Sequence, residues 1–427
     1  MRTKTLVFGG AAFLAIALAP LHVATAQTLL DSIQLVHTSS IRIDLARSSV
    51  EIAQENVVQA RAGLFPSVSL TAEALGRQPT IGLPGWVGEF TLGLELEQPI
   101  FHGYQLANGV SWAEAQVAIS LAELIRVGQE EFLSAVEAFC DVYRDETIYY
   151  LSGEYREIVV EDADEIEKLV RDGAATQSDL AVAQAQLAVA DTRRASASAG
   201  LASSLAIYSQ VVGGPSAGLS RPFITSFPLF PATSNEAATI ALAEHPSVTR
   251  AVHEVAAARL RVEIARGELM PAVDAIVRLD AQVAGGQANA GVAVLGRITV
   301  PLFGGGGGRS EIREAELLLA QAQSLLDQTR IIARAIAESA FAQLAATQAR
   351  HAAATALVEA RTRIVTEIEA GVAARDAALS ELSRVRLYLV DARIALAGAE
   401  RDLIANLYAL QAALGRLRPE VFGLTSW

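Results

Sequence analysis

The sequence has a single cysteine and no excess of basic residues, and each of these shortages excludes a class of protein. Cys140 is the only cysteine among 427 residues, so a disulfide framework and a cysteine-based metal site are excluded. We expect a buried thiol, because Cys140 lies on an apolar helical face. Asp and Glu outnumber Lys and Arg by 47 to 34, whereas nucleic-acid binding needs basic patches. The acidic balance is compatible with surfaces that prefer cations.

Beyond the N-terminus the sequence also lacks an apolar stretch long enough to cross a bilayer as a helix. The N-terminus itself has the pattern of a signal peptide. Arg2 and Lys4 are basic, residues 6–18 are apolar, and residues 24–26 are small, as cleavage requires. We therefore predict a signal peptide over residues 1–26. A retained N-terminal anchor is the alternative.

Proline is absent from two long stretches, residues 105–170 and 309–370. A helix over either stretch could reach about 100 Å, since an α-helix rises 1.5 Å per residue. Helices of that length exceed a single globular core and imply coiled-coil packing. In the second stretch, small and apolar residues recur in alternating steps of three and four, as a coiled-coil seam requires. The predicted seam residues are Ile312, Ala315, Leu319, Ala322, Leu326, Ala333, Ile336 and Ala340.

What the chain does contain is one pattern that occurs twice. Pro301 follows Pro99 by 202 residues, and both lie in similar segments, Gln-Pro-Ile-Phe and Val-Pro-Leu-Phe. Gly415 follows Gly213 by the same 202 residues, so chance similarity is improbable. The stretch between the halves is rich in glycine and proline, as a linker is. We predict a first repeat over 27–213, a linker over 214–235, a second repeat over 236–415 and a C-terminal tail over 416–427.

Each repeat contains two segments in which apolar and polar residues alternate strictly. In the first segment Val68 and Leu70 alternate with Ser69 and Thr71. Such alternation predicts strands with one apolar and one polar face, and about ten residues suffice for a tilted strand to cross a membrane. The charged residues on the polar face suit a water-filled lumen. Two hairpins on a soluble sheet are the alternative.

The order predicted for each repeat is helix, strand, strand, long helix, turn and helix. The first helix should run from about Leu30 to Leu64, because proline disfavours helix before it. Four prolines are assigned to strand–helix junctions, namely Pro66, Pro99, Pro271 and Pro301.

The predicted fold is therefore mainly α with a transmembrane β-barrel, in which a long coiled-coil helical barrel carries four strands per chain. Four strands cannot close a barrel alone, because each unpaired backbone group facing lipid costs several kcal/mol. A trimer would complete a 12-stranded barrel, although the strand count alone does not require three copies.

The duplicated order of elements resembles the TolC family of outer membrane efflux proteins, and so do the Leu-Phe-Pro and Leu-Met-Pro segments before the first strands. Residues 173–180 match the family's pattern of glycine, Ser or Thr and an acidic residue. The resemblance covers essentially the whole chain after the predicted signal peptide. It implies a homotrimeric conduit in the bacterial outer membrane, with its helical tunnel in the periplasm, for tripartite efflux or type I secretion. The implied partners are a periplasmic adaptor, an inner-membrane pump or ABC exporter, and outer-membrane lipid.

The resemblance also implies a constriction at the periplasmic tips of the helices. Glu381 and Arg384 are the aperture candidates that it suggests, and their spacing allows them to pair along one helical face. Asp179 is a weaker aperture candidate. The alternative is that these are ordinary solvated charges.

The turns at the two predicted tips are candidates for docking the adaptor. The residues proposed for this contact are Gly173, Thr176 and Arg375. Arg375 stands where the repeat predicts glycine, so the second turn is expected to differ from the first. The acidic run 161–167, which leads to the first tip, could line the tunnel entrance or form a solvated face.

No catalytic, cofactor or metal-binding motif is predicted, because the histidines are scattered and no nucleophile motif occurs. We therefore expect a channel and not an enzyme. The alternative function is a soluble periplasmic coiled-coil scaffold or adaptor of an export system. That alternative would leave the two alternating hairpins unexplained.

Overall fold

The computed structural model describes residues 27–78, 86–216, 218–222, 230–284 and 286–427. The predicted signal peptide and parts of the predicted linker lie outside these ranges. Within them the elements are α1 (Leu29–Ser39), α2 (Ile41–Ala62), β1 (Ser67–Arg77), β2 (Val87–His102), α3 (Gln105–Arg171), α4 (Gln177–Val212), α5 (Ser234–Glu244), α6 (Pro246–Gly267), β3 (Ala272–Ala284), β4 (Gln287–Thr299), α7 (Gly307–Ala374), α8 (Leu379–Ala413) and a 3₁₀ turn (Pro419–Phe422).

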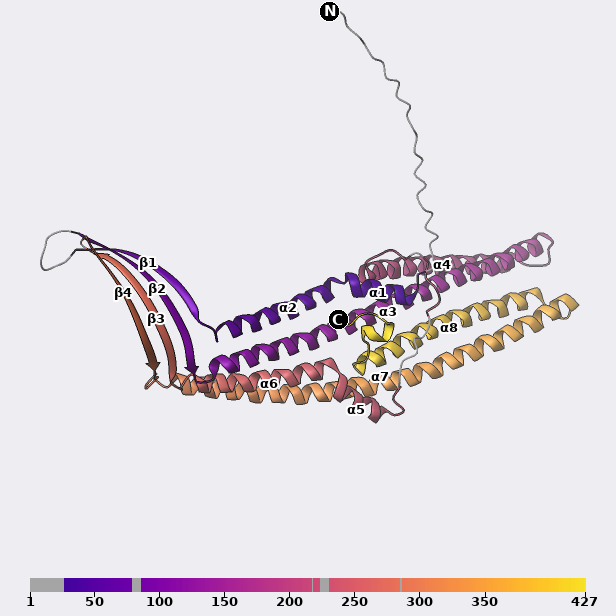
Figure 1. Cartoon of the computed structure of the whole chain (residues 1–427). Coiled ribbons are helices and arrows are strands. Elements are labelled where there is room, and N and C mark those ends of the chain that lie inside the picture. The colour runs from indigo at the N-terminus through magenta and orange to yellow at the C-terminus, as the bar shows by residue number, and fades with distance from the viewer. Residues whose placement is uncertain (1–26, 79–85, 217, 223–229, 285) are drawn as a thin grey trace, which may run out of the picture.

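The four strands form one antiparallel sheet in the order β1-β2-β3-β4, which curves away from one end of the helices (Figure 1). The register aligns the apolar positions of all four strands. Leu70 lies opposite Leu94, Leu94 opposite Leu279, and Leu279 opposite Val292. Because residues two apart share a face, the predicted alternations merge into one continuous apolar face. This face is open to the surroundings, with Leu70 68% and Val292 70% exposed.

Charged residues on the other face pair between strands. Arg278 Nε donates to Glu95 Oε2 at 2.8 Å, which joins β3 to β2. His102 Nε2 lies 2.7 Å from Asp274 Oδ1 and joins the same two strands near their helical end. Pairs of opposite charge on neighbouring strands stabilise a sheet by a few tenths of a kcal/mol to about 1 kcal/mol each. The polar face predicted from the alternation is therefore an organised, charged surface.

Pro99 lies inside a strand and not at a strand–helix junction, as the sequence had suggested. Pro66, Pro271 and Pro301 lie outside the strands, whereas Pro99 is inside β2, which continues to His102. The pairing of β2 with β3 shifts between Pro99 and Phe101. Proline has no N–H to donate to a ladder, and a β-bulge is one of the few places in a sheet that tolerates it. The bulge thus accommodates Pro99 without ending the strand.

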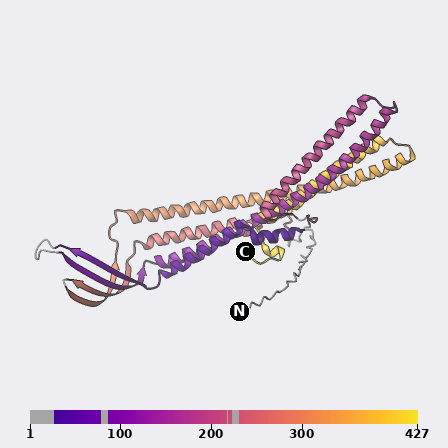
Figure 2. The same cartoon turned by 90° about the horizontal axis from the view of Figure 1, so that it is seen from above.

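The helices continue from the sheet as a long, narrow layer (Figures 1 and 2). The 67 residues of α3 and the 68 residues of α7 run almost its whole length. Next to the sheet, α2, α3, α6 and α7 pack in that order, and farther away the order becomes α4, α3, α8 and α7. The far end consists of two helical hairpins, the first formed by α3 and α4 and the second by α7 and α8 (Figure 2).

The first predicted helix, from Leu30 to Leu64, is wrong as a single element, because the chain breaks at Ser40. Ser40 has an extended backbone and caps α2, its Oγ accepting from Ile43 N at 3.5 Å. The same Oγ donates to Glu131 Oε2 on α3 at 2.7 Å. A similar break in the second half follows His245, where Pro246 begins α6. The breaks divert α5 (Figure 1) and α1 (Figure 2) from the helical layer near its middle.

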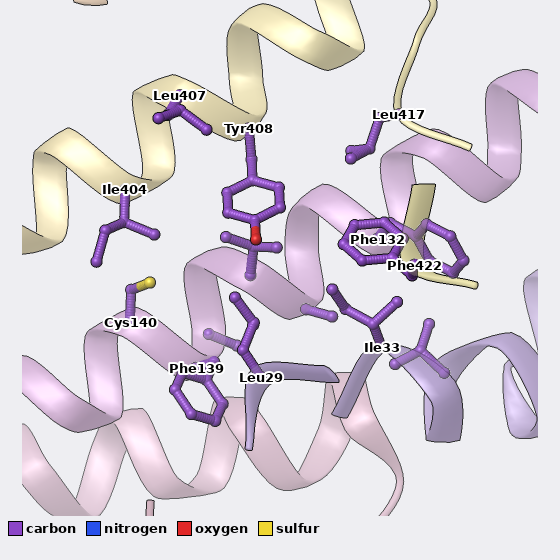
Figure 3. Close-up of a cluster of buried hydrophobic side chains, with 14 of the residues drawn as sticks. Leu29, Ile33, Phe132, Phe139, Cys140, Ile404, Leu407, Tyr408, Leu417 and Phe422 are labelled. Carbon is purple, nitrogen blue, oxygen red and sulfur yellow. The ribbon is translucent and has the colours of Figure 1, made fainter. Parts of the chain in front are cut away.

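The main hydrophobic core lies at this middle level. It gathers α1, α3, α8 and the C-terminal 3₁₀ turn around side chains such as Phe132, Phe139 and Tyr408 (Figure 3). Cys140 belongs to this core and is 1% exposed, as predicted for a buried thiol. Burial raises the pKa of its thiol to about 12. Trp427 also packs here, against Phe132 and against the helix surface at Gly128.

The predicted seam on α7 is correct only in part. Ala315 and Ala333 are buried, and Ala315 packs on α6. Farther along, Ile336 is 46% exposed while its neighbour Ala337 is fully buried. A straight helix drifts relative to a seven-residue repeat, and α7 also changes partners along its length, since it packs on α6, α5 and α8. In the part of the chain that the structure describes, none of the helices combines the length and apolarity needed to cross a bilayer.

Candidate functional site

The first tip turn connects α3 to α4 through a glycine. Gly173 adopts φ +72°, a left-handed conformation that glycine reaches at no steric cost. Ala174 N then donates to Leu169 O at 2.8 Å and Gly173 N to Val170 O at 3.1 Å, which closes the end of α3. This is the usual way for a helix to end on a left-handed residue. A Cβ added at Gly173 would meet no atom within 4 Å, so the backbone conformation and not a lack of space favours glycine here.

Thr176 and Asp179 form a capping box at the start of α4. Asp179 N donates to Thr176 Oγ1 at 3.2 Å, and Asp179 Oδ2 accepts from Thr176 N at 2.8 Å and from Thr176 Oγ1 at 2.7 Å. The hydrogen bond from the Thr176 backbone lowers the pKa of the Asp179 carboxyl, with the threonine hydroxyl contributing in the same direction. Asp179 thus stabilises the helix start, a role that its Thr-x-x-Asp spacing could have revealed.

The second tip turn has the same backbone hydrogen bonds, displaced by 202 residues. Asp376 N donates to Gly371 O at 2.8 Å, as Ala174 N does to Leu169 O in the first turn. Arg375 occupies the position of Gly173 and adopts φ +67°. The expectation that losing the glycine would alter the turn is wrong. The arginine accepts the left-handed conformation, at a cost of roughly 1–2 kcal/mol relative to glycine.

The start of α8 differs from that of α4 in its side chains. Ala378 stands where Thr176 caps α4, and no side chain caps α8. Glu381, the counterpart of Asp179, is therefore not used by a cap. Its Oε1 lies 3.5 Å from Arg384 Nη2, so the two predicted aperture residues pair as their spacing suggests. The Arg384 side chain is 61% exposed, whereas that of Glu381 is partly covered, at 43%.

Apolar contacts hold the second hairpin together just behind its tip. Val365 on α7 packs with Leu382, Val385 and Leu389 on α8. Arg361 on α7 also lies 4.9 Å from the ring centre of Tyr388 on α8, a cation–π contact. The charges of Glu381 and Arg384 therefore stand on a hairpin with its own small core.

The acidic run 161–167 leads to the first tip and is half-buried to exposed, with Glu161, Asp164 and Glu167 its exposed members. Two of its carboxylates have partners: Glu165 lies 3.7 Å from Lys168, and Glu161 lies 3.9 Å from Arg386 on α8. Among the described residues, no group of three or more His, Cys, Asp or Glu side chains is arranged to hold a metal ion.

Comparison with known proteins shows which family has this architecture. Residues 33–214 and 238–416 match the outer membrane efflux protein family, which covers both predicted repeats. The chain belongs to the outer membrane efflux protein family. A curated relative is the outer membrane efflux protein BepC of Brucella suis, which is 28% identical over 407 residues, or 94% of this chain and 88% of BepC.

Solved channels of other bacteria share the fold of this efflux protein. The CmeC outer membrane channel of Campylobacter jejuni aligns with a TM-score of 0.79 at 14% identity, covering 97% of this chain and 94% of CmeC. The outer membrane protein VceC of Vibrio cholerae aligns with a TM-score of 0.77 at 19% identity, covering 91% of this chain and 96% of VceC. The predicted TolC-like fold and the location in the bacterial outer membrane, with helices in the periplasm, are thereby confirmed. The alternative function, a soluble periplasmic scaffold or adaptor, is therefore rejected.

Proposed function

We propose that three copies of this efflux protein assemble into a TolC-type channel-tunnel, a passive exit duct for tripartite efflux or type I secretion. The observation that carries the proposal is the sheet, in which β1 and β4 lie at the two edges and, within the described residues, each pair with one neighbour. The sheet has a continuous apolar face that suits lipid, but open strand edges are not tolerated there. Pairing β4 of one copy with β1 of the next in a ring of three gives a closed barrel of twelve strands.

The edges of the helical layer support the same assembly. Next to the sheet, α2 and α7 are the outermost helices, and both expose large apolar side chains. Ile41 and Ile52 on α2 are 76% and 63% exposed, and Leu317 and Ile331 on α7 are 72% and 70% exposed. Exposed apolar patches of this kind mark protein contacts. Packing α7 of one copy on α2 of the next would bury them and continue the order of the strands.

The gate in this proposal is the second tip. Threefold repetition would bring three Glu381 and three Arg384 side chains together around the tunnel axis, where they would limit the aperture. Gly173, Thr176 and Arg375 at the turns are the proposed contacts for a periplasmic adaptor, which would link the duct to an inner-membrane pump or ABC exporter. The equivalent backbone of the two turns supports the use of both by one kind of adaptor hairpin.

Two measurements test the proposal. Chemical crosslinking and native mass spectrometry of the protein in detergent should show a trimer, and a protein that stays monomeric would contradict the closed barrel. Replacing Glu381 and Arg384 with Ala should raise the single-channel conductance in planar bilayers. The matched control replaces Asp327 and Arg330, another pair three residues apart on α7, at 3.3 Å. Equal conductance of the tip variant and the control would refute the aperture role.

A further inference from the structure

The middle of the helical layer contains a cavity where one helix ends and another begins. α6 and α8 occupy the same slot between α3 and α7, with α6 next to the sheet and α8 farther away (Figure 1). The chain enters α6 at Pro246 and leaves α8 after Ala413, so neither helix fills the slot between these two residues. A cavity of about 660 Å³ remains there. This volume lies within the usual range of small-molecule pockets.

The two chain ends that border the cavity are tied to each other. Arg416, just beyond α8, donates from Nε to Glu244 Oε2 at 2.8 Å and from Nη2 to Glu244 Oε1 at 2.7 Å. Gly415 adopts φ +79°, and a Cβ there would overlap the backbone oxygen of Glu244. Because an ion pair and a close backbone contact both hold this junction, the cavity is preformed by the fold.

The cavity has one wall that is mainly apolar and one that carries hydrogen-bond donors. The apolar wall comes from α7 and α8 and consists mostly of small residues: Ala335, Ile336, Ala340, Ala409, Ala412 and Ala413. The polar members of this wall, Ser339 and Gln343, bond to each other, with Nε2 of the glutamine 3.4 Å from the serine Oγ. Gln129 on α3 and His245 at the start of α6 line the other wall.

Gln129 is buried with an unused hydrogen-bond donor. Its side chain is 4% exposed, and its Nε2 has no hydrogen-bond partner among the described residues. Most buried polar groups in folded proteins have a partner, and leaving one without costs about 1–3 kcal/mol. An acceptor held in the cavity would supply the missing partner.

His245 provides a second neutral donor. Its Nδ1 accepts from Ser247 N at 3.2 Å, so the proton of the neutral ring is on Nε2. Burial lowers the pKa of His245, and the charge of Arg126 acts in the same direction. The ring therefore stays neutral and keeps its Nε2–H available for an acceptor.

The charged residues at the cavity are already paired with one another. Arg126 Nε donates to Glu123 Oε2 at 2.9 Å, and its Nη1 donates to Glu130. Glu130 also lies 3.1 Å from Arg42 on α2. Since these charges neutralise each other, the cavity presents neutral donors beside an apolar wall, which favours an uncharged ligand that accepts hydrogen bonds.

We propose that this cavity is a binding site for a small uncharged aromatic molecule that bears a carbonyl oxygen. The ring lies against the alanines of α7 and α8, where flat, small side chains leave room for it. The carbonyl oxygen accepts from Gln129 and His245. Gln129 is then the residue that selects an acceptor over a purely apolar molecule, because its amide is desolvated whether or not the cavity is filled.

The site lies on the side of α3 that faces away from the main core. Gly128 and Phe132 lie toward that core, whereas Arg126 and Glu130 are each two residues earlier. Two residues correspond to about 200° around a helix, so the two pairs lie on opposite sides of α3. A ring of helices keeps its bore open only with the main core outside, and the cavity then faces the bore. This location rests on the proposed channel, whereas binding to a single chain does not.

Fluorine NMR of the full-length protein in lipid nanodiscs tests the site, with 4-fluorobenzamide as the probe and empty nanodiscs as the baseline. The probe signal should broaden saturably with the parent protein. Ala412→Trp fills the cavity and should abolish the broadening. Gln129→Leu keeps the size of the side chain but removes the donor, and it should weaken binding by about three- to tenfold. Because it also removes an unpaired buried amide, it should leave the melting temperature equal or higher.

The matched control is Gln411→Leu on α8. Gln411 is 1% exposed and its Nε2 also lacks a hydrogen-bond partner among the described residues. It lies three residues from Tyr408 and from Leu414, and so on the side of α8 that faces the main core. This variant should resemble Gln129→Leu in melting temperature but should bind the probe as the parent does.

Three results would overturn the site. Broadening that is absent from the parent, or equal in Ala412→Trp, would mean a cavity that holds water only. Unchanged binding by Gln129→Leu would remove the assigned donor, and tighter binding of 4-fluorobenzoate than of the amide would contradict an uncharged ligand. A conducting trimer that does not bind the probe refutes the site alone. Binding by a protein that stays monomeric refutes the channel and leaves the site standing.

Discussion

The second tip turn can be converted into a copy of the first by two substitutions, Arg375→Gly and Ala378→Thr. The first removes a left-handed arginine, and glycine at such a position is favoured by about 1 kcal/mol or more. The second supplies the missing cap, which is typically worth about 1 kcal/mol. Ala378 already has the extended backbone of a cap residue, with φ −79° and ψ 145°. Glu381 stands three residues later, where a capping box requires an acid.

Together the two changes should stabilise the second turn by about 2 kcal/mol, since they act on the end of one helix and the start of the next. An increase of that size lowers the open fraction of the turn about 30-fold. Amide hydrogen exchange measured by mass spectrometry would report this as slower exchange of residues 376–382. Thr176→Ala should have the opposite effect on residues 174–180, where the existing capping box would be lost.

Equal exchange of residues 376–382 in the parent and the double variant would refute the reasoning, provided that Thr176→Ala does accelerate exchange at the first tip. In that case the shared hydrogen bonds of the two turns would not reflect equivalent energetics. A successful cap should also draw Glu381 away from Arg384. The variant therefore offers a way to change the charges of the proposed aperture without deleting either one.

Two further substitutions test the core and its charges. Gly128→Ala should destabilise the protein by about 1–3 kcal/mol and lower its melting temperature, because a Cβ there would overlap the Trp427 ring. The control is Gly398→Ala, where a Cβ meets open space and the melting temperature should stay equal or rise. The hydrogen bond from Arg416 lowers the pKa of Glu244 below its ordinary 4.5. The stability from this pair is therefore present above that value and lost as the pH falls through the lowered pKa. Glu244→Gln should reduce the loss of melting temperature between pH 6 and pH 3, and an unchanged loss would contradict the assignment.

Much of the fold could be predicted from local patterns. The strands follow from strict alternation around Val68, Leu94 and Leu279, because side chains on a strand change face at every residue. The long helices follow from the absence of proline. The spacing of 202 residues between Pro99 and Pro301 also holds for the two tip turns. Asp376 lies 202 residues after Ala174, and the two backbone N–H groups make equivalent hydrogen bonds.

Other features depended on contacts between distant residues. The break at Ser40 is not marked by proline or glycine, and it is stabilised by Glu131 on another helix. The extension of β2 beyond Pro99 depends on a bulge against β3. The burial of Ala337 in place of Ile336 depends on which helix lies beside α7 at that level. Local propensity cannot anticipate such features, because a partner far along the chain decides them.

The candidate site shows the same division. The sequence alone determined that Glu381 and Arg384 share a helical face, since helical periodicity places residues three apart together. The left-handed conformation of Arg375 was not evident from the sequence, although it is a local feature: the closing hydrogen bonds join backbone atoms of residues 371–376 and do not depend on the side chain at position 375. Only the packing of α8 against α3 brought Arg386 and Arg393 beside carboxylates more than 200 residues earlier. Helical periodicity predicts which residues share a face of a helix, whereas the packing of neighbouring helices determines which residues that face contacts.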